Sequence, residues 1–160
     1  MRLSPEDAFD IYADQVFRAA YSVCRNQEDA DDVIQDTFIK YCSQEWDFST
    51  PEHLKAWLLR VAINRAKDLQ RQFWRKNAVS YEDYEMTLEF PEPPDREVFE
   101  AVMDLPPKYR ITIHLYYYED YSIAEIAAML RYSQSAVKSQ LSRGRSLLKS
   151  RLLEVWNDEQ

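Results

Sequence analysis

Apolar residues recur every three to four positions through the first half of the chain, a spacing that places them along one face of a helix. The spacing predicts helices over about residues 8–24, 28–45 and 51–75. The third begins with Ser49-Thr50-Pro51, a cap followed by proline at the first helical position. The positions expected inside are Phe9, Tyr12, Val16, Ala20 and Val23, then Ala30, Val33, Ile34, Phe38, Tyr41 and Cys42, then Leu54, Trp57, Leu58, Val61, Ala62 and Leu69.

The same spacing returns after residue 95. It predicts two short helices over 97–105 and 108–118, and two further helices that meet at a tight turn within 121–153. Ser122 is the expected N-cap of the first of these, with Glu125 completing a capping box, and Ser133 caps the second. The positions expected inside are Val98, Val102, Leu105, Ile111, Leu115 and Tyr118, then Ile123, Ile126, Ala127 and Leu130, then Val137, Leu141, Leu148 and Leu152 with Gly144 on the same face.

Residues 77–94 separate the two halves. They show no sustained period, they are acidic, and they contain three prolines near their end. This composition is typical of a linker. We therefore expect an all-α protein of two small helical domains, residues 1–76 and 95–160, joined by an acidic linker that contains proline.

One face of the last helix carries short hydroxyl side chains between cations. At about 100° per residue, and with Val137 facing inward, six outward positions form what we call the serine stripe. They are Ser135, Ser139, Ser142 and Ser146 together with the flanking cations Lys138 and Arg143. A surface helix of an ordinary helical core would mix both charge signs, but 131–153 has six cations and no carboxylate. Short side chains allow close approach to a groove, and hydroxyls and cations bond to base edges and phosphates. The two helices therefore predict a DNA-binding helix-turn-helix.

Two polar surfaces distinguish the first domain. Asp32, Gln35 and Asp36, spaced i, i+3 and i+4, form one acidic facet suited to a basic partner helix. Cations beside aromatics in the third helix suit unstacked, single-stranded DNA, although a solvated basic helix with Trp57 and Phe73 in the core is the simpler alternative. The cations are Lys55, Arg60, Arg65, Lys67, Arg71, Arg75 and Lys76, with Phe73 and Trp74 among them, and Asp68 is the single acid between Lys55 and Lys76.

Charge is unevenly distributed. The chain has 20 cationic and 28 acidic residues, a net charge of -8. Residues 77–100 contain 1 cation and 8 carboxylates, whereas 1–76 contain 11 and 13. Phosphate attraction is the main sequence-independent term in DNA binding. An acidic tether between two basic surfaces is therefore expected to restrain nonspecific DNA binding by the free protein.

The remaining composition argues against several classes of function. We expect no catalytic residues, cofactor or metal, because the sequence offers no nucleophile–base pair, metal cluster or phosphate-binding glycine loop. Cys24 and Cys42 are expected as small buried side chains, and His53 and His114 stand alone. No apolar run of about 18 residues or signal segment occurs, which predicts a cytoplasmic protein without membrane insertion.

Three segments together resemble the extracytoplasmic-function group of sigma-70 RNA polymerase sigma factors. Residues 28–48, with A-D-D-V-I-Q-D-T-F-I-K, are similar to the family's region 2.2 helix. Residues 54–71, L-K-A-W-L-L-R-V-A-I-N-R-A-K-D-L-Q-R, resemble the helix that opens the downstream promoter element. L-P-P-K-Y-R, Y-S-I-A-E-I-A-A-M-L and S-A-V-K-S-Q-L-S-R-G-R resemble region 4. One helix-turn-helix is weak evidence, but these motifs in this order cover nearly the whole chain.

The resemblance implies a sigma factor that binds core RNA polymerase and directs promoter recognition. The acidic facet would bind the clamp helices of the β′ subunit, region 4 would meet the β flap, and an anti-sigma factor is a further candidate partner. Promoter contacts implied for the minus-10 element are a base-capture loop of Asp47, Phe48, Ser49 and Thr50, and strand contacts from Arg60, Asn64, Lys67 and Arg71. Those implied for the minus-35 element are Ser135, Lys138, Ser139, Ser142 and Arg143.

The chain departs from the family pattern in the helix-turn-helix. Arg131 stands where glycine is usual and Tyr132 where a small aliphatic residue is usual. This predicts either a non-glycine residue at positive φ or a turn of different shape. Gln140 replaces a residue that is commonly basic. The alternative function is a stand-alone two-domain helix-turn-helix transcriptional regulator, which accounts for 121–153 but leaves the acidic facet unexplained.

Overall fold

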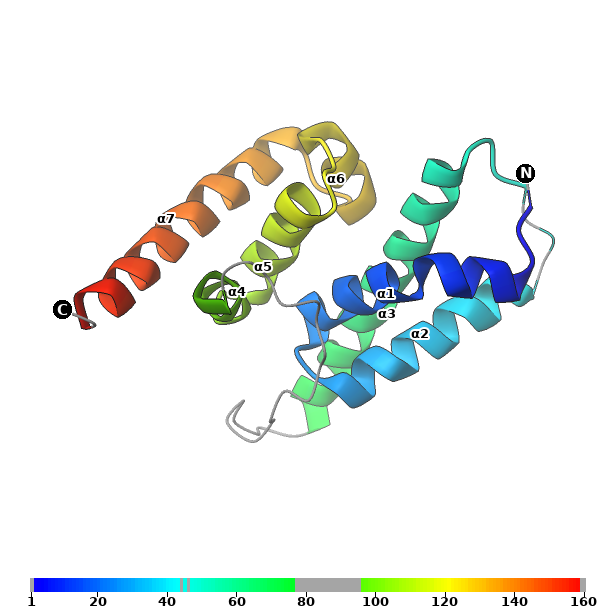
Figure 1. The fold of residues 1–160 in the computed structure, drawn as a ribbon, viewed down its shortest axis with the longest axis horizontal. Helices are drawn as coiled ribbons and strands as arrows, with labels where there is room; N and C mark the ends of the chain where they lie inside the picture. Colours follow the sequence, from blue (N-terminus) through cyan, green and yellow to red (C-terminus); the bar gives the residue numbers. More distant parts are fainter. Residues whose placement is uncertain (1, 44, 46, 77–95, 159–160) are drawn as a thin grey trace. The chain divides into compact units, whose positions relative to one another are not determined.

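The computed structural model describes residues 2–158, apart from 44, 46 and 77–95 (Figure 1). The described residues form helices and connecting turns without any strand, which confirms the predicted all-α class. The chain divides into two compact units, Met1–Thr87 and Leu88–Gln160. The linker predicted over 77–94 lies outside the described residues.

The first unit is a three-helix bundle of α1 (Pro5–Cys24), α2 (Gln27–Cys42) and α3 (Pro51–Lys76). Each helix packs against the other two, and Figure 1 shows α1 and α2 side by side with α3 crossing them. The core therefore draws on all three helices. Its fully buried members include Ala8, Val16, Ala19, Ala20, Ala30, Val33, Leu54, Leu58, Leu59, Ala62, Ile63 and Ala66.

Side-chain caps set where these helices begin. Asn26 Oδ1 accepts a hydrogen bond of 3.1 Å from the Asp29 amide, and Thr50 Oγ1 accepts one of 3.1 Å from the His53 amide. Each bond satisfies an amide that has no partner in the first helical turn. Arg25 adopts a left-handed conformation with φ of 52° between α1 and α2, which allows the chain to reverse within two residues.

Three expectations for this core are wrong. Phe9 is 46% exposed and meets Phe38 with its rings 5.1 Å apart, and Cys42 is exposed rather than buried. The predicted stripe on α3 also missed buried residues, among them Leu59 and Ile63, both 0% exposed. The reason is that α1 and α2 cover adjacent sides of α3, so that the buried face of this helix is wider than one apolar stripe.

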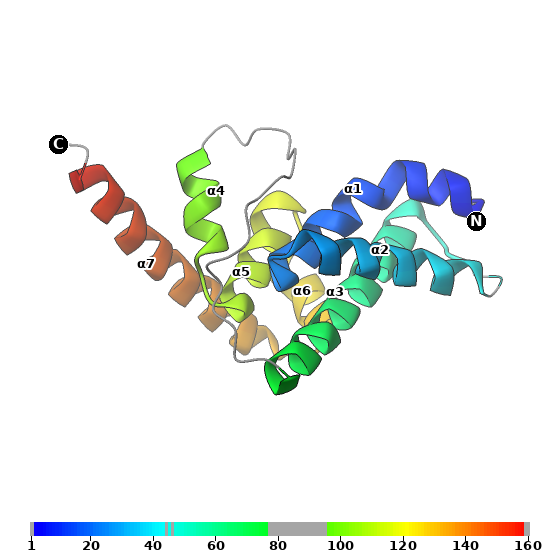
Figure 2. The same cartoon turned by 90° about the horizontal axis from the view of Figure 1, so that it is seen from below.

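The second unit contains α4 (Arg96–Met103), α5 (Pro107–Ile113), a π-helical turn η2 (His114–Tyr118), α6 (Ile123–Leu130) and α7 (Gln134–Asp158). The long helix α7 packs against α4, α5 and α6 (Figure 2). Gly144, the chain's single glycine, lies where α7 meets α5. A Cβ atom there would stand 3.2 Å from the Ile113 side chain, so the missing side chain permits this close approach.

The π-helical turn explains why Tyr118 is 44% exposed although helical spacing placed it inside. The Glu119 amide bonds to His114 O at 3.2 Å, a separation of five residues. This inserts one residue into the turn and rotates the next part of the chain about the helix axis. Glu119 becomes buried, and its Oε1 atom lies 3.4 Å from His114 Nε2, which corrects the expectation that His114 stands alone.

Candidate nucleic-acid interface

The serine stripe lies where the sequence predicts it. Val137 and Leu141, on the inner face of α7, are at most 1% exposed. Ser133 Oγ accepts a 3.0 Å hydrogen bond from the Ala136 amide and fixes the start of the helix. The six residues of the stripe are all exposed, and among the described residues no hydrogen bond or ion pair engages their side chains. Their hydroxyl and cationic groups are thus available to a ligand.

The turn before α7 uses a non-glycine residue in the left-handed region. Arg131 has φ of 60° and ψ of 41° and ends α6, while the Ser122–Glu125 capping box begins it. This confirms the first of the two turn geometries expected for Arg131. Gln140 faces inward, with its Oε1 atom 2.8 Å from Thr112 Oγ1 on α5. This hydrogen bond joins α7 to α5.

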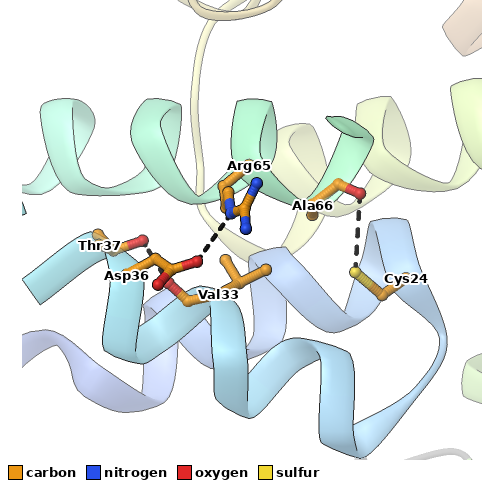
Figure 3. A network of polar contacts seen from close by, with 6 residues as sticks. All are labelled: Cys24, Val33, Asp36, Thr37, Arg65 and Ala66. Carbon is orange, nitrogen blue, oxygen red and sulfur yellow. Dashed lines mark hydrogen bonds and ion pairs between the residues drawn. The ribbon is translucent and has the colours of Figure 1, made fainter. Parts of the chain in front are cut away.

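The acidic facet is only partly available. Asp32 and Gln35 are exposed on α2. Asp36 instead accepts a 2.7 Å hydrogen bond from Arg65 Nε, and this half-exposed ion pair joins α2 to α3 (Figure 3). Sequence reasoning also missed Ile39, which is 65% exposed and lies one turn beyond Gln35 on the same side of the helix. The exposed surface therefore consists of Asp32, Gln35 and Ile39.

The base-capture loop, Asp47–Thr50, is anchored by an aromatic cluster. Phe48 is 4% exposed, with its ring 6.4 Å from Tyr41, 5.6 Å from Trp57 and 5.1 Å from His53. The expectation that Phe48 itself presents a surface to a base does not fit this burial. Its ring instead fixes the loop against α2 and α3. The other three loop residues are exposed.

Four residues of α3 form what we call the basic stripe: Arg60, Asn64, Lys67 and Arg71. Their spacing of four, three and four places them on one face, away from the buried Leu58, Ala62 and Ala66. Arg60 and Arg71 are exposed, whereas Asn64 and Lys67 are half-buried. Burial, with a smaller contribution from Arg71, lowers the pKa of Lys67 below its usual value. The side chains of Phe73, Trp74, Arg75 and Lys76 lie outside the described residues.

An apolar groove of about 500 Å³ opens in the second unit between α4, the end of α5 with η2, and α7. Arg145 and Lys149 contribute cations to its lining, and Tyr117 and Tyr118 are 50% and 44% exposed there. Arg145 Nε donates a 2.5 Å hydrogen bond to Tyr117 Oη. The groove has the character of a docking site for a mainly apolar helix. Its other lining residues are Val98, Val102, Ile113, Leu148, Leu152 and Leu153.

The described residues contain no group of three or more His, Cys, Asp or Glu side chains placed to hold a metal ion. Cys24 is buried, with its thiol 3.9 Å from Ala66 O (Figure 3), and Cys42 is exposed at the end of α2. Within the described part of the chain, no helix has the length and apolar character needed to cross a bilayer.

Comparisons with known proteins match both units. Residues 8–77 match the model of Sigma-70 region 2, and residues 95–148 match that of Sigma-70, region 4. The chain is 31% identical over 144 residues to RNA polymerase sigma factor NccH of Alcaligenes xylosoxydans xylosoxydans, an alignment that covers 82% of this chain and 77% of that protein. It is 29% identical over 138 residues to RNA polymerase sigma factor SigV of Bacillus subtilis (strain 168), covering 85% and 83%.

A solved structure has a similar fold. It is the sigma factor RpoE in complex with the anti-sigma factor NepR from Bartonella quintana, with a TM-score of 0.76, 22% identity and coverage of 92% of this chain and 95% of that chain. The family matches in both halves do not favour a stand-alone regulator. The chain belongs to the extracytoplasmic-function group of the sigma-70 family, and its function is to direct transcription initiation with core RNA polymerase on promoter DNA.

Proposed function

We propose that this sigma factor divides promoter recognition between its two units. Residues 1–76 act as region 2, which binds core polymerase and opens the minus-10 element, and residues 95–160 act as region 4, which recognises the minus-35 element. Residues 77–94 connect them. The observation that supports this most strongly is the serine stripe, an exposed row of hydroxyls and cations without intramolecular partners among the described residues.

The serine stripe suits paired DNA. Serine side chains let the α7 backbone approach the floor of a major groove, and Lys138 and Arg143 reach phosphates or guanine edges from its flanks. Val137 and Leu141, buried on the inner face of α7, fix which face of the helix carries the stripe. The stripe is therefore exposed and accessible to duplex DNA in the structure described.

The first unit suits separated strands. A captured base would enter beside the exposed Asp47, Ser49 and Thr50, with the buried Phe48 holding the loop in place. The basic stripe would follow the phosphates of the same strand. Extrusion of one base costs a few kcal/mol, so capture of that base stabilises the open state and couples recognition to melting.

Two surfaces face the polymerase in this proposal. Asp32 and Gln35 bind a basic helix of the β′ clamp, whereas Asp36 is paired with Arg65. The apolar groove in the second unit receives the β flap. An anti-sigma factor, the kind of partner named for the similar RpoE structure, is a further candidate to bind these surfaces. The protein itself supplies no catalytic group, since polymerase performs the chemistry, and it works at promoters in the cytoplasm.

Permanganate footprinting, which detects unpaired thymines, tests the proposal. Promoter DNA is incubated with the full chain, with core polymerase from the same organism, or with both. Reactive thymines are expected in the minus-10 element only when both proteins are present. Reactive thymines with the chain alone, or a lack of reactivity with both proteins on every genomic promoter fragment, would overturn it.

A further inference from the structure

The base-capture loop needs a surface on which an extruded base can rest, and Phe48 does not provide it. The Phe48 ring is 4% exposed and packs among Tyr41, Trp57 and His53. Trp57 is half-buried on the same side of the bundle. Among the described rings of this cluster, only that of His53 belongs to an exposed residue. His53 is therefore the most exposed residue among the described rings of this cluster.

Three contacts hold His53 against the loop. Its ring stands nearly perpendicular to Phe48, at 88° and 5.1 Å, and its Nδ1 atom lies 3.3 Å from Ser49 Oγ. Its backbone amide donates a 3.1 Å hydrogen bond to Thr50 Oγ1. Consecutive loop residues 48, 49 and 50 thus each contact His53, which fixes the position of the imidazole beside them.

Apart from its edge contact with Phe48, the imidazole contributes little to the fold at this position. The bond to Thr50 uses the backbone amide, which any residue except proline supplies. The Ser49 contact is exposed to water and contributes little to stability. What histidine adds is an aromatic face and a second ring nitrogen, Nε2, which has no hydrogen-bond partner among the described residues. Aromatic faces stack on unpaired bases, and ring nitrogens bond to base edges.

We propose that His53 is a base-contacting residue of the loop, with its imidazole stacked on the nucleobase extruded from the separated promoter strand. This inference rests on the proposed role of the loop in strand capture and assigns the stacking surface to His53. Ser49 and Phe48 orient the ring so that its face meets the base. The ligand is one unstacked base of single-stranded DNA.

The test is a double-mutant cycle that combines a protein substitution with an abasic site in the DNA. Open-complex stability is measured with core polymerase and the full chain on promoters that carry one abasic site at a time across the minus-10 element. His53→Ala is expected to weaken the open complex by about 5- to 150-fold on intact DNA, the effect of one lost base–aromatic contact. His53→Phe, which keeps an aromatic face, is expected to restore most of the loss.

The abasic promoters separate contact from a structural role. When the abasic site lies at the position of the captured base, the open complexes formed with His53→Ala and with the unaltered chain should be equally stable to within about twofold, because the stacking partner is already absent. A His53→Ala defect of the same size on every abasic promoter, or no defect on intact DNA, would overturn the proposal. Ser49→Ala removes the hydroxyl that contacts His53 Nδ1 and is therefore the control for ring orientation. If the unaltered chain opens no promoter with core polymerase, the proposed function is wrong, and the proposal for His53 that rests on it is wrong as well.

Discussion

The two surfaces proposed to contact DNA are built in opposite ways. The serine stripe stands exposed on α7, and the described protein makes no bond to its side chains. In the first unit, several of the predicted site residues are buried or half-buried within the helix bundle. Phe48 is buried in an aromatic cluster, and Asn64 and Lys67 are half-buried.

This difference matches the physical tasks proposed for the two surfaces. A helix that recognises duplex DNA enters an existing groove and needs only accessible groups on a rigid support. A surface that holds a separated strand must position a loop and a row of cations, because the strand itself is available only after melting. Changes in the serine stripe should therefore alter DNA binding alone. Changes at half-buried site residues of the first unit, such as Lys67, should alter stability and binding together.

The largest effect is expected at the polymerase contact. Asp32→Lys combined with Gln35→Lys places two cations against a basic partner, and repulsion of like charges costs several kcal/mol. We expect core affinity to fall by at least about 100-fold, about 3 kcal/mol, with unchanged thermal unfolding because both residues are exposed. Binding is measured by fluorescence anisotropy of the labelled chain.

The control is Asp10→Lys with Asp14→Lys, two exposed residues of α1 that change net charge by at least as much. Asp36 is left unaltered, because a lysine there would face Arg65 and disturb the α2–α3 contact. If the α1 control and the facet variant lose core affinity equally, the facet is not the docking site.

A smaller effect is expected from the serine stripe. Arg143→Ala should weaken recognition of the minus-35 element by about 1–3 kcal/mol and relax its sequence preference, as for loss of one base contact. Stability should not change. Run-off transcription on the cognate promoter and on variants with single base changes measures both effects. Arg151→Ala on the same helix removes a cation bonded to Asp104 at 2.6 Å and should leave promoter preference unaltered.

Lys67 allows the coupling in the first unit to be tested. Its pKa is lowered by burial and by Arg71, so the charged form is disfavoured in the folded state. Lys67→Met should raise the free energy of unfolding by about 0.5–1 kcal/mol and weaken promoter opening. The unfolded chain binds more protons between the lowered pKa and the ordinary value. Stability of the unaltered chain should therefore rise with pH in that window, a slope that Lys67→Met loses.

Urea unfolding across that pH range and permanganate reactivity at neutral pH provide the two readouts. Lys67→Arg, which keeps the charge, is the matched variant and should retain promoter opening. A Lys67→Met protein that is less stable, yet opens promoters normally, would show that this side chain belongs to the fold and not to the strand contact.

The smallest effect is expected at the helix-turn-helix turn. Arg131 has φ of 60°, a conformation that costs a non-glycine residue roughly 1 kcal/mol. Arg131→Gly should stabilise the second unit by about 0.5–1 kcal/mol, or a few degrees in Tm. Arg131→Ala removes the same charge but keeps the strain, so it should give no gain. Equal Tm values for the two variants would refute the backbone explanation.

The accuracy of sequence reasoning followed the same division between the units. Periodicity within α7 was sufficient for the serine stripe, because Val137 and Leu141 fix which face is buried. The capping box at Ser122 was likewise encoded by adjacent residues, and positive φ at Arg131 was one of the two turn geometries they allowed. Such local features do not depend on which other segments pack nearby.

Features that depend on distant segments were missed. The partner of Asp36 is Arg65, 29 residues away on another helix, and the burial of Phe48 depends on Tyr41 and Trp57 from two helices. No local pattern reveals either contact. Tyr118 was misplaced for a different reason, since the π-helical turn shifts the helical register by one residue. Domain boundaries and the roles of individual site residues remain predictions.

Mapping of DNA cleavage from two single cysteines tests the division of labour most directly. Cys42→Ser first removes the exposed native thiol, while Cys24 stays buried. Ser139→Cys and Ser49→Cys are nearly isosteric changes that give attachment points for an iron-chelate cleavage reagent. The account predicts cleavage from position 139 in the minus-35 duplex both before and after melting, and cleavage from position 49 in the minus-10 strand only after melting. Cleavage of the same element from both positions, or minus-10 cleavage from position 49 while the DNA is still paired, would contradict it.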